Sequence, residues 1–281
     1  MINYKLLLTT VFFSIFSLSC SSNEDSSNTE DGIEGLTVKN FPVIDGSDST
    51  TPLRTILMCE LLGFNYTWER RPFTQEPGED IKFVSPVYTC SNEDSNYLMW
   101  NCLKESNTHY SFVNLIDSTV DIILAARSIS RDEKKYADEK GVTLTEKPIA
   151  KDALIFMVNP QNPVTSLTTT QIQGIYTGNI VNWNEVGGAD AAIKPYVRNA
   201  NSGSEEKFET TVMAGLTVKS FPEMRVGLTM MSPYYQLKDD INGIGFTPYY
   251  YYSTIVDNGT TKAIAVDGVM PNVEISTYVS I

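Results

Sequence analysis

Three segments of this chain combine small polar side chains with the predicted start of a helix. The first is RNANSGSEEKFE, residues 198–209, in which Arg198 precedes a run of turn-forming residues. Helical spacing of apolar residues begins at Phe208, so the run is typical of a loop that leads into a helix. A helix N-terminus presents unpaired N–H groups and a partial positive charge, and an arginine adds two parallel donors. Such a junction can hold an anion.

The same design occurs twice more, at residues 47–51 and 106–109. In the first case Pro52 stands at a favoured first helical position, with Ser49 or Thr50 as the cap. Each loop alone also has a purely structural explanation, because Ser and Thr cap many helices and Arg198 could form a surface ion pair. The recurrence favours three loops that together replace the water around one small anion, although spacing does not show that the loops meet.

The composition argues against several other functions. The formal net charge of −13 argues against a nucleic-acid-binding surface. His109 is the only histidine, so the sequence offers few ligands for a zinc site and a single candidate for the histidine of a Ser-His-Asp triad. A hydrolase that used a loop serine would need a general base, and nothing in the sequence places a carboxylate behind His109. We therefore expect a binding protein without catalytic residues, metal or other cofactor, rather than an enzyme.

The N-terminus has the pattern of an export signal. Residues 1–19 contain one lysine followed by the apolar run LLLTTVFFSIFSLS, which is too short for a convincing membrane-spanning helix. Cys20 follows directly and resembles the lipidated cysteine of bacterial lipoproteins, although Ser17 stands where an aliphatic residue is usual. The alternative is an ordinary cleaved signal with a coincidental cysteine. The acidic, Ser- and Asn-rich residues 20–36 favour the lipoprotein, because they suit a flexible tether to a membrane.

Three cysteines follow Cys20 in the sequence, namely Cys59, Cys90 and Cys102. In an exported protein Cys90 and Cys102 could form a disulfide that closes a short loop, which would leave Cys59 buried and free. The odd number of cysteines leaves this pairing open.

Predicted strands and helices alternate after the tether. VDIILAA and DALIFMVNP are continuous apolar runs of the kind found in a sheet covered on both faces, and RDEKKYADEKG is a solvated helix that ends at Gly141. GIGFTPYYYYSTI and TKAIAVDGV are predicted as late strands. Residues 65–105 are rich in Pro, Asn, Asp and Glu, and we expect mainly long loops there. This order predicts an α/β architecture with largely parallel sheets.

The segments IDGSDSTTPL, VDIILAARSIS, NWNEVGG, RNANSGSEEKFE and IGFTPYYYYSTI occur in an order that resembles phosphate-binding lipoproteins of the bacterial phosphate ABC transporter. The similarity covers residues 38–275 and looks like the shorter branch of that family found in Bacteroidetes-type bacteria. It implies a two-lobed, type II periplasmic-binding-protein-like fold with a ligand cleft between the lobes. One lobe would comprise residues 37–150 and 248–281, and the other residues 151–247.

The resemblance also implies roles for individual residues. The ligand would be phosphate or a similar inorganic oxyanion, passed to an ABC transporter permease by a monomer that is lipid-anchored in the cell envelope, on its periplasmic or its outer face. Thr108 stands where the family has a phosphate-binding serine. The implied ligand contacts are Ser49, Thr50, Thr51, Thr108, His109, Arg198, Ser202, Gly203 and Ser204.

Two positions depart from the family. Ala200 replaces an aspartate that accepts a hydrogen bond from protonated phosphate, and Ala126 followed by Arg127 replaces a second acidic residue. We therefore expect weaker discrimination between phosphate and sulfate. Arg127 could be a further anion contact or a surface charge. The alternative function is a surface lipoprotein that kept the scaffold, lost the small anion and binds a partner through residues 65–105.

Overall fold

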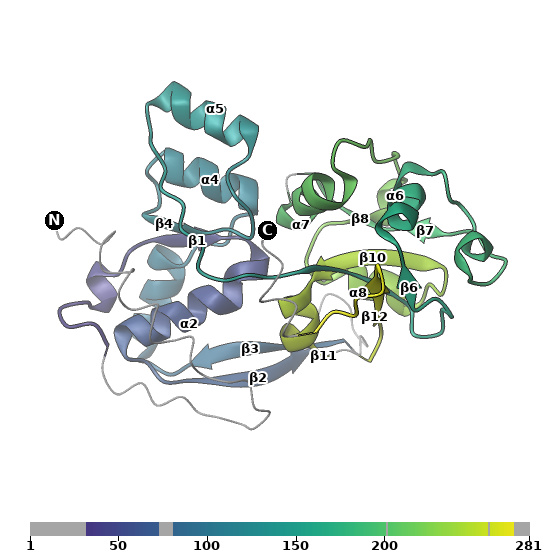
Figure 1. Cartoon of the computed structure of the whole chain (residues 1–281). Helices are drawn as coiled ribbons and strands as arrows, with labels where there is room; N and C mark the ends of the chain where they lie inside the picture. Colours follow the sequence, from purple (N-terminus) through teal and green to yellow (C-terminus); the bar gives the residue numbers. More distant parts are fainter. Residues whose placement is uncertain (1–31, 73–80, 201, 258, 273–281) are drawn as a thin grey trace.

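The computed structural model describes residues 32–72, 81–200, 202–257 and 259–272, which form two α/β lobes side by side (Figure 1). The predicted signal peptide, Cys20 and most of the predicted tether lie outside these residues. No helix in the described ranges is both long and apolar enough to cross a bilayer.

The first lobe is built on a short parallel pair of strands, β1 (Ile44–Gly46) and β4 (Ile122–Leu124). Leu103 forms a parallel bridge with Ile44 as well. Parallel segments end at the same edge of a sheet, so the chain that follows β1 and the chain that follows Leu103 emerge close together. The helices of this lobe are α2 (Thr51–Leu62), α4 (Thr108–Ile116) and α5 (Arg131–Lys140), which ends at Gly141 as predicted.

Buried apolar side chains hold α2 against this strand pair. Leu57, Met58 and Cys59 of the helix pack in one cluster with Ile44 and Leu124. At about 1.5–3 kcal/mol for each fully buried large side chain, this cluster fixes where the N-terminus of α2 points.

A three-stranded sheet extends the first lobe. β2 (Tyr66–Pro72) and β3 (Lys82–Tyr88) are antiparallel, and β11 (Val256–Asp257) pairs with the other edge of β3. Helix α3 (Asn92–Tyr97) and the helical turn Leu98–Cys102 follow β3. The prediction of mainly loops over residues 65–105 is therefore wrong. Few side chains of these strands are buried, so the sequence shows no clean apolar alternation there.

The second lobe contains a five-stranded sheet in the order β6–β12–β5–β10–β7. The strands are β5 (Leu154–Val158), β6 (Ser166–Leu167), β7 (Lys194–Pro195), β10 (Gly243–Pro248) and β12 (Lys262–Val266). β5 is antiparallel to β10 and to β12, and only the edge strands β6 and β7 are parallel to their neighbours. The expectation of largely parallel sheets is wrong in this lobe. A continuous apolar run shows that both faces of β5 are covered, and it carries no information about the direction of the neighbouring strands.

Aromatic packing orients the helices of the second lobe. Phe208 is fully buried, and its ring centroid lies 4.6 Å from that of Tyr176 and 4.5 Å from that of Phe246 on β10. Phe208 directly follows α7, so this contact anchors α7 on the sheet. The remaining elements are α6 (Thr169–Thr177), α7 (Gly203–Lys207), α8 (Ser232–Lys238), the parallel pair β8 (Val197–Arg198) and β9 (Val226–Gly227), and the helical turns Val38–Asn40, Asp48–Thr50, Trp183–Val186, Phe208–Met213, Glu223–Arg225 and Tyr251–Ile255.

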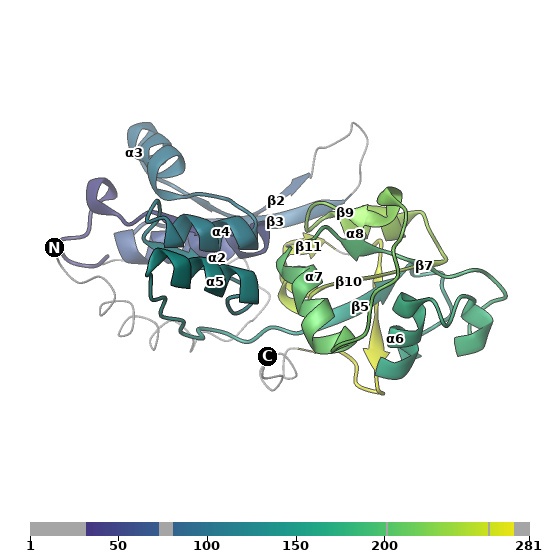
Figure 2. The ribbon, with the colours of Figure 1, turned by 90° about the horizontal axis from the view of Figure 1, so that it is seen from above.

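Within the described residues, the chain passes between the lobes three times. The first passage follows α5 and leads to β5, as both views show (Figures 1 and 2). The chain then returns to the first lobe at β11, next to β3, and passes back to the second sheet at β12. Residues 262–266 therefore lie in the second lobe, whereas the sequence assigned residues 248–281 to the first. The physical reason is that β12 pairs with the edge of β5 that β10 leaves open.

All three cysteines of the described chain are free thiols. The Cys102 thiol points into the core of the first lobe, where Sγ donates to the Phe41 carbonyl oxygen at 3.8 Å. Cys90 is half-buried, and its Sγ donates to the Ser91 carbonyl oxygen. The predicted Cys90–Cys102 disulfide is absent from this structure, because the two thiols face different surroundings. Cys59 is buried and free as expected, and this burial raises its pKa to about 12.

Candidate anion-binding site

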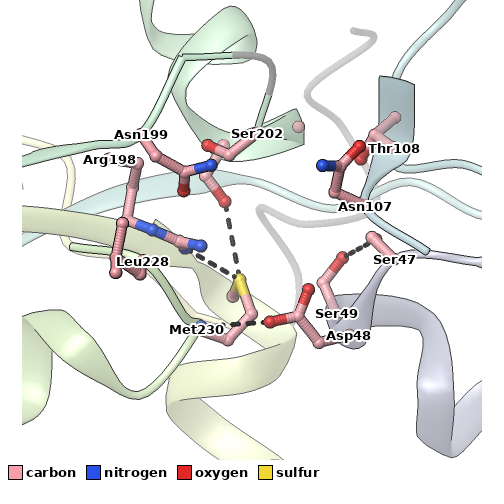
Figure 3. A pocket seen from close by; sticks show the side chains of 12 residues that line it. Ser47, Asp48, Ser49, Asn107, Thr108, Arg198, Asn199, Ser202, Leu228 and Met230 are labelled. Atoms are coloured by element: carbon pink, nitrogen blue, oxygen red, sulfur yellow. Dashed lines mark hydrogen bonds between the residues drawn. The ribbon is translucent and has the colours of Figure 1, made fainter. Parts of the chain in front are cut away.

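A polar pocket lies between the two lobes, with side chains of one lobe facing those of the other (Figure 3). The cavity volume is about 30 Å³, and a cavity needs about 10–15 Å³ measured in this way to hold one water, so the pocket suits a small ligand. Its lining residues are Ser47, Asp48, Ser49, Asn107, Thr108, Arg198, Asn199, Ser202, Gly203, Ser204, Leu228 and Met230.

The loop after β1 contributes Ser47, Asp48 and Ser49. The Oγ atoms of Ser47 and Ser49 lie 2.7 Å apart and share a hydrogen bond. The helical turn Asp48–Thr50 precedes α2, so the first free N–H groups lie one turn earlier than the sequence predicted.

Thr50 and Thr51 therefore do not line the pocket. The Thr50 hydroxyl donates to the carbonyl oxygens of Ser47 and Leu124, at 2.8 and 3.1 Å, and the Thr51 hydroxyl donates to Glu105 at 2.7 Å. Their backbone N–H groups donate within the same turn. Both residues shape the loop and do not present donors to a ligand.

The second loop places Thr108 in the pocket as the first residue of α4. Asn107 caps this helix by accepting the N–H of Tyr110 at 2.9 Å. The Thr108 hydroxyl is completely buried and has no hydrogen-bond partner among the described residues. A Cβ added to Gly203 of the other lobe would lie 2.7 Å from this hydroxyl, so only glycine allows the two loops to approach so closely.

Arg198 lies in β8 with 5% of its surface exposed. Its Nε donates to the Gly227 carbonyl oxygen at 3.1 Å, and its Nη1 donates to the Met230 sulfur at 3.1 Å. A guanidinium has five N–H donors and a thioether is a weak acceptor, so an oxyanion would be a much stronger partner. Burial lowers the pKa of Arg198, while the charges of Asp48 and Glu205 oppose this fall.

The third loop holds Ser202, Gly203 and Ser204 at the start of α7. Ser202 caps α7 by accepting the N–H of Glu205 at 3.1 Å, and the Ser204 hydroxyl donates to the Met230 sulfur at 3.7 Å. The Glu205 carboxyl accepts the backbone N–H of Arg198 at 2.6 Å and so ties α7 to β8. Burial raises the pKa of Glu205 to about 7.

Arg127 and His109 lie outside the pocket, in a charged cluster beside it. Arg127 donates to both carboxylate oxygens of Glu133, at 2.8 and 2.7 Å, and His109 Nδ1 lies 3.0 Å from the same carboxylate. Arg127 Nε also lies 2.5 Å from Glu206 Oε2 of the second lobe, an ion pair rather than an aligned hydrogen bond. The structure therefore makes Arg127 neither an anion contact nor a free surface charge, because its guanidinium joins the two lobes.

The structure thus brings together six of the residues that the sequence indicated and places four elsewhere. Asp48 could have been recognised from its place directly before the indicated Ser49. Leu228 and Met230 could not, because apolar side chains carry no sequence signal of an anion site. Within the described residues, no group of three or more His, Cys, Asp and Glu side chains could hold a metal ion.

Two α/β lobes with a polar pocket between them define a bilobal binding protein. The chain belongs to the PBP superfamily, because residues 104–276 match the PBP superfamily domain. The predicted α/β fold of the periplasmic-binding-protein kind is confirmed.

Curated relatives of the chain are distant. Protein SphX of Synechococcus elongatus is 28% identical over 186 residues, which cover 60% of this chain and 52% of SphX. The phosphate-binding protein PstS of Staphylococcus saprophyticus is 29% identical over 150 residues, which cover 52% of this chain and 46% of PstS. The chain spans about half the length of these relatives.

Solved structures share the fold. One is a Clostridium perfringens protein with bound phosphate, named as a phosphate ABC transporter substrate-binding protein. Its TM-score is 0.58 at 24% identity, with 84% of this chain and 79% of that chain covered. Another is an ABC-type phosphate transport receptor from Vibrio cholerae, with a TM-score of 0.52 at 21% identity, and 82% of this chain and 78% of that chain are covered.

Proposed function

We propose that this protein is an extracytoplasmic solute-binding lipoprotein that captures phosphate, or a similar tetrahedral oxyanion, for an ABC transporter. The observation that carries the proposal is the Arg198 guanidinium, which is buried at the pocket with a thioether sulfur as the acceptor of Nη1. A desolvated cation gains most from an anionic partner, because the effective dielectric constant inside a protein is low.

Donors from both lobes support the same ligand. Thr108 of the first lobe and Ser202 and Ser204 of the second line one pocket with Arg198. A buried hydroxyl without a partner destabilises a protein by about 1–3 kcal/mol, so a ligand oxygen next to Thr108 would recover this energy. The similar proteins of Staphylococcus, Clostridium and Vibrio are named for phosphate binding or transport, which supports the same ligand.

The remaining parts of the proposal concern the cell envelope. A lipid on Cys20 would hold the protein at a membrane, and the acidic chain would bind its solute as a monomer and pass it to a permease. The formal net charge of −13 argues against nucleic acid as a partner. Hydrolysis is disfavoured because the only histidine of the chain, His109, contacts Glu133 outside the pocket.

A second function has one observation in its favour. Trp100 is 79% exposed and Met99 is 55% exposed on the turn Leu98–Cys102, inside the segment that the sequence suggested for partner binding. Exposed aromatic and Met side chains are enriched in protein interfaces. A scaffold protein of this kind would bind no small anion.

Titration calorimetry with phosphate and with sulfate decides between the two functions. We expect binding of at least one of these oxyanions with a dissociation constant of about 1 μM or lower, equivalent to about −8 kcal/mol. Absence of heat with both oxyanions, in protein that melts cooperatively, would refute the proposed capture function and leave the interaction module.

A further inference from the structure

A charged cluster beside the pocket joins the two lobes. Its members are His109 on α4, Arg127 after β4, Glu133 on α5 and Glu206 on α7, and we call this cluster the latch. The first three belong to the first lobe and Glu206 belongs to the second. Arg127 Nε lies 2.5 Å from Glu206 Oε2, so an ion pair crosses from one lobe to the other.

Glu133 holds the Arg127 guanidinium in one orientation. It accepts from Nη1 and Nη2 of Arg127 at 2.8 and 2.7 Å, and it also accepts the Ser130 N–H at 2.9 Å. The Phe112 ring centroid lies 5.2 Å from Arg127 Cζ. A guanidinium is planar, so a carboxylate that binds its two Nη atoms leaves the Nε edge free for another partner. The first lobe thus presents a fixed cation to Glu206.

The latch continues into the walls of the pocket. Glu206 lies three residues after Gly203 on α7, so both residues occupy the same face of this helix. A Cβ added to Gly203 would lie 2.7 Å from Thr108 Oγ1 and 3.8 Å from Ala126 Cβ. Ala126 directly precedes Arg127 in the chain. The ion pair and the pocket residues Thr108 and Gly203 therefore belong to one contact between the lobes.

Burial strengthens this ion pair. The side chain of Arg127 is 5% exposed and that of Glu206 is 24% exposed. Charges shielded from water attract each other more strongly than surface charges, and salt screens them less. Every partner in the latch is a side chain of the protein itself, so the attraction between the lobes does not require a solute.

We propose that the Arg127–Glu206 ion pair holds the lobes together without a solute, so that the two walls of the pocket are in position before an oxyanion arrives. Arg127 and Glu206 are then positioning residues that do not touch the ligand. The apparent affinity of a ligand rises with the fraction of molecules in the binding-competent arrangement, so the latch should tighten binding. The effect on affinity rests on the proposed capture of an oxyanion, whereas the closure of the lobes does not.

The test uses a variant that removes only the charge of the second lobe. Glu206→Gln breaks the ion pair between the lobes and leaves Arg127 paired with Glu133. Glu209→Gln is the matched control, because it removes the same charge from an exposed side chain in the helical turn that follows α7. Hydrogen–deuterium exchange of the full-length protein in mild detergent, without oxyanion, is measured by mass spectrometry around Thr108, which lies in the opposite lobe. Calorimetry then gives the affinities for phosphate and for sulfate.

We expect faster exchange around Thr108 in Glu206→Gln and an affinity for phosphate that is weaker by roughly 5- to 30-fold, with unchanged stability against urea. Glu209→Gln should behave like the unchanged protein. Unchanged exchange around Thr108 in Glu206→Gln, or an equal increase in Glu209→Gln, would overturn the latch. A loss of stability against urea without this selective increase would overturn it as well, because Glu206 would then serve only the fold of its own lobe.

Two further outcomes separate the latch from the proposed function. Faster exchange in Glu206→Gln with an unchanged phosphate affinity would overturn the positioning role of the ion pair. Faster exchange in a protein that binds neither phosphate nor sulfate would refute the capture function and leave the latch in place.

Discussion

Replacing Arg198 by methionine separates the contribution of this residue to binding from its contribution to folding. The substitution keeps a long side chain and removes the charge. In the unliganded protein it removes the Nε bond to Gly227 and the Nη1 contact with Met230. The Gly227 carbonyl oxygen still accepts the backbone N–H of Asn199 at 3.0 Å, so no buried acceptor is left unpaired.

The two effects differ in size. An oxyanion that receives two charge-assisted hydrogen bonds from Arg198 gains about 3–6 kcal/mol, at about 1.5–3 kcal/mol each. Their loss should raise the dissociation constant for phosphate by roughly 10²- to 10⁴-fold. Stability without ligand should change by no more than about 1 kcal/mol or should increase, because a buried charge is replaced by an apolar side chain of similar volume.

The assay is calorimetric titration with phosphate, together with urea unfolding of the ligand-free protein. Arg131→Met is the matched control, because Arg131 is an exposed residue at the start of α5, outside the pocket. We expect the control to bind phosphate like the unchanged protein. Unchanged phosphate affinity in Arg198→Met would refute the assignment of the site. A large loss of ligand-free stability would show that Arg198 serves mainly to hold the fold.

Three further substitutions test other parts of the molecule. Gly203→Ala places a methyl group against the buried Thr108 hydroxyl and should weaken phosphate binding by about 1–3 kcal/mol with an unchanged circular dichroism spectrum. The control Gly259→Ala adds its methyl group in open space and should leave the phosphate affinity unchanged. Equal phosphate affinities of the two variants in calorimetry would contradict this prediction. Glu205 has a pKa raised to about 7 from 4.5 in the folded protein, so the folded state binds the proton more tightly and this contribution to stability is lost as the pH rises from 4.5 to about 7. Glu205→Gln should reduce that decline in urea unfolding, and an identical decline would refute it. Cys20→Ala should move the protein from the detergent phase to the aqueous phase with phosphate binding intact, and a native protein that is already aqueous would exclude the lipid anchor.

Helix starts are the features that the sequence predicted best. Asn107 and Ser202 both cap the helices that follow them, because a side-chain oxygen that accepts a nearby backbone N–H is a local signal. The start of α2 agrees as well, because Thr50 is its N-cap and Pro52 lies in its first turn, although the turn Asp48–Thr50 adds N–H groups ahead of Thr51. A one-turn extension of this kind depends on the hydrogen bonds of the Thr50 hydroxyl to Ser47 and Leu124, and Leu124 is far away in the sequence.

Contacts between distant segments were beyond prediction. Arg127 pairs with Glu133 of its own lobe and with Glu206 of the other lobe. Its role therefore depends on how the two lobes are placed. Met230 lines the pocket, although an apolar side chain gives no sequence signal of an anion site. The segment Tyr251–Ile255 was predicted as a strand because tyrosine favours strands, yet it is helical. Tyr251 and Ile255 are buried in one apolar cluster with Met230, and this packing outweighs the local preference.

The route of the chain determines when each lobe can be completed during synthesis. β5 reaches its neighbours only when β10 and β12 have been made, and β3 receives its partner on one edge only when β11 has been made. Neither sheet can therefore be completed before the residues between 243 and 266 have been made, although the strand β3 already ends at Tyr88. A ribosome that stops before that stretch releases two incomplete sheets with open strand edges, which are the surfaces most prone to aggregation. The stretch between residues 243 and 266 thus completes the main sheets of both lobes.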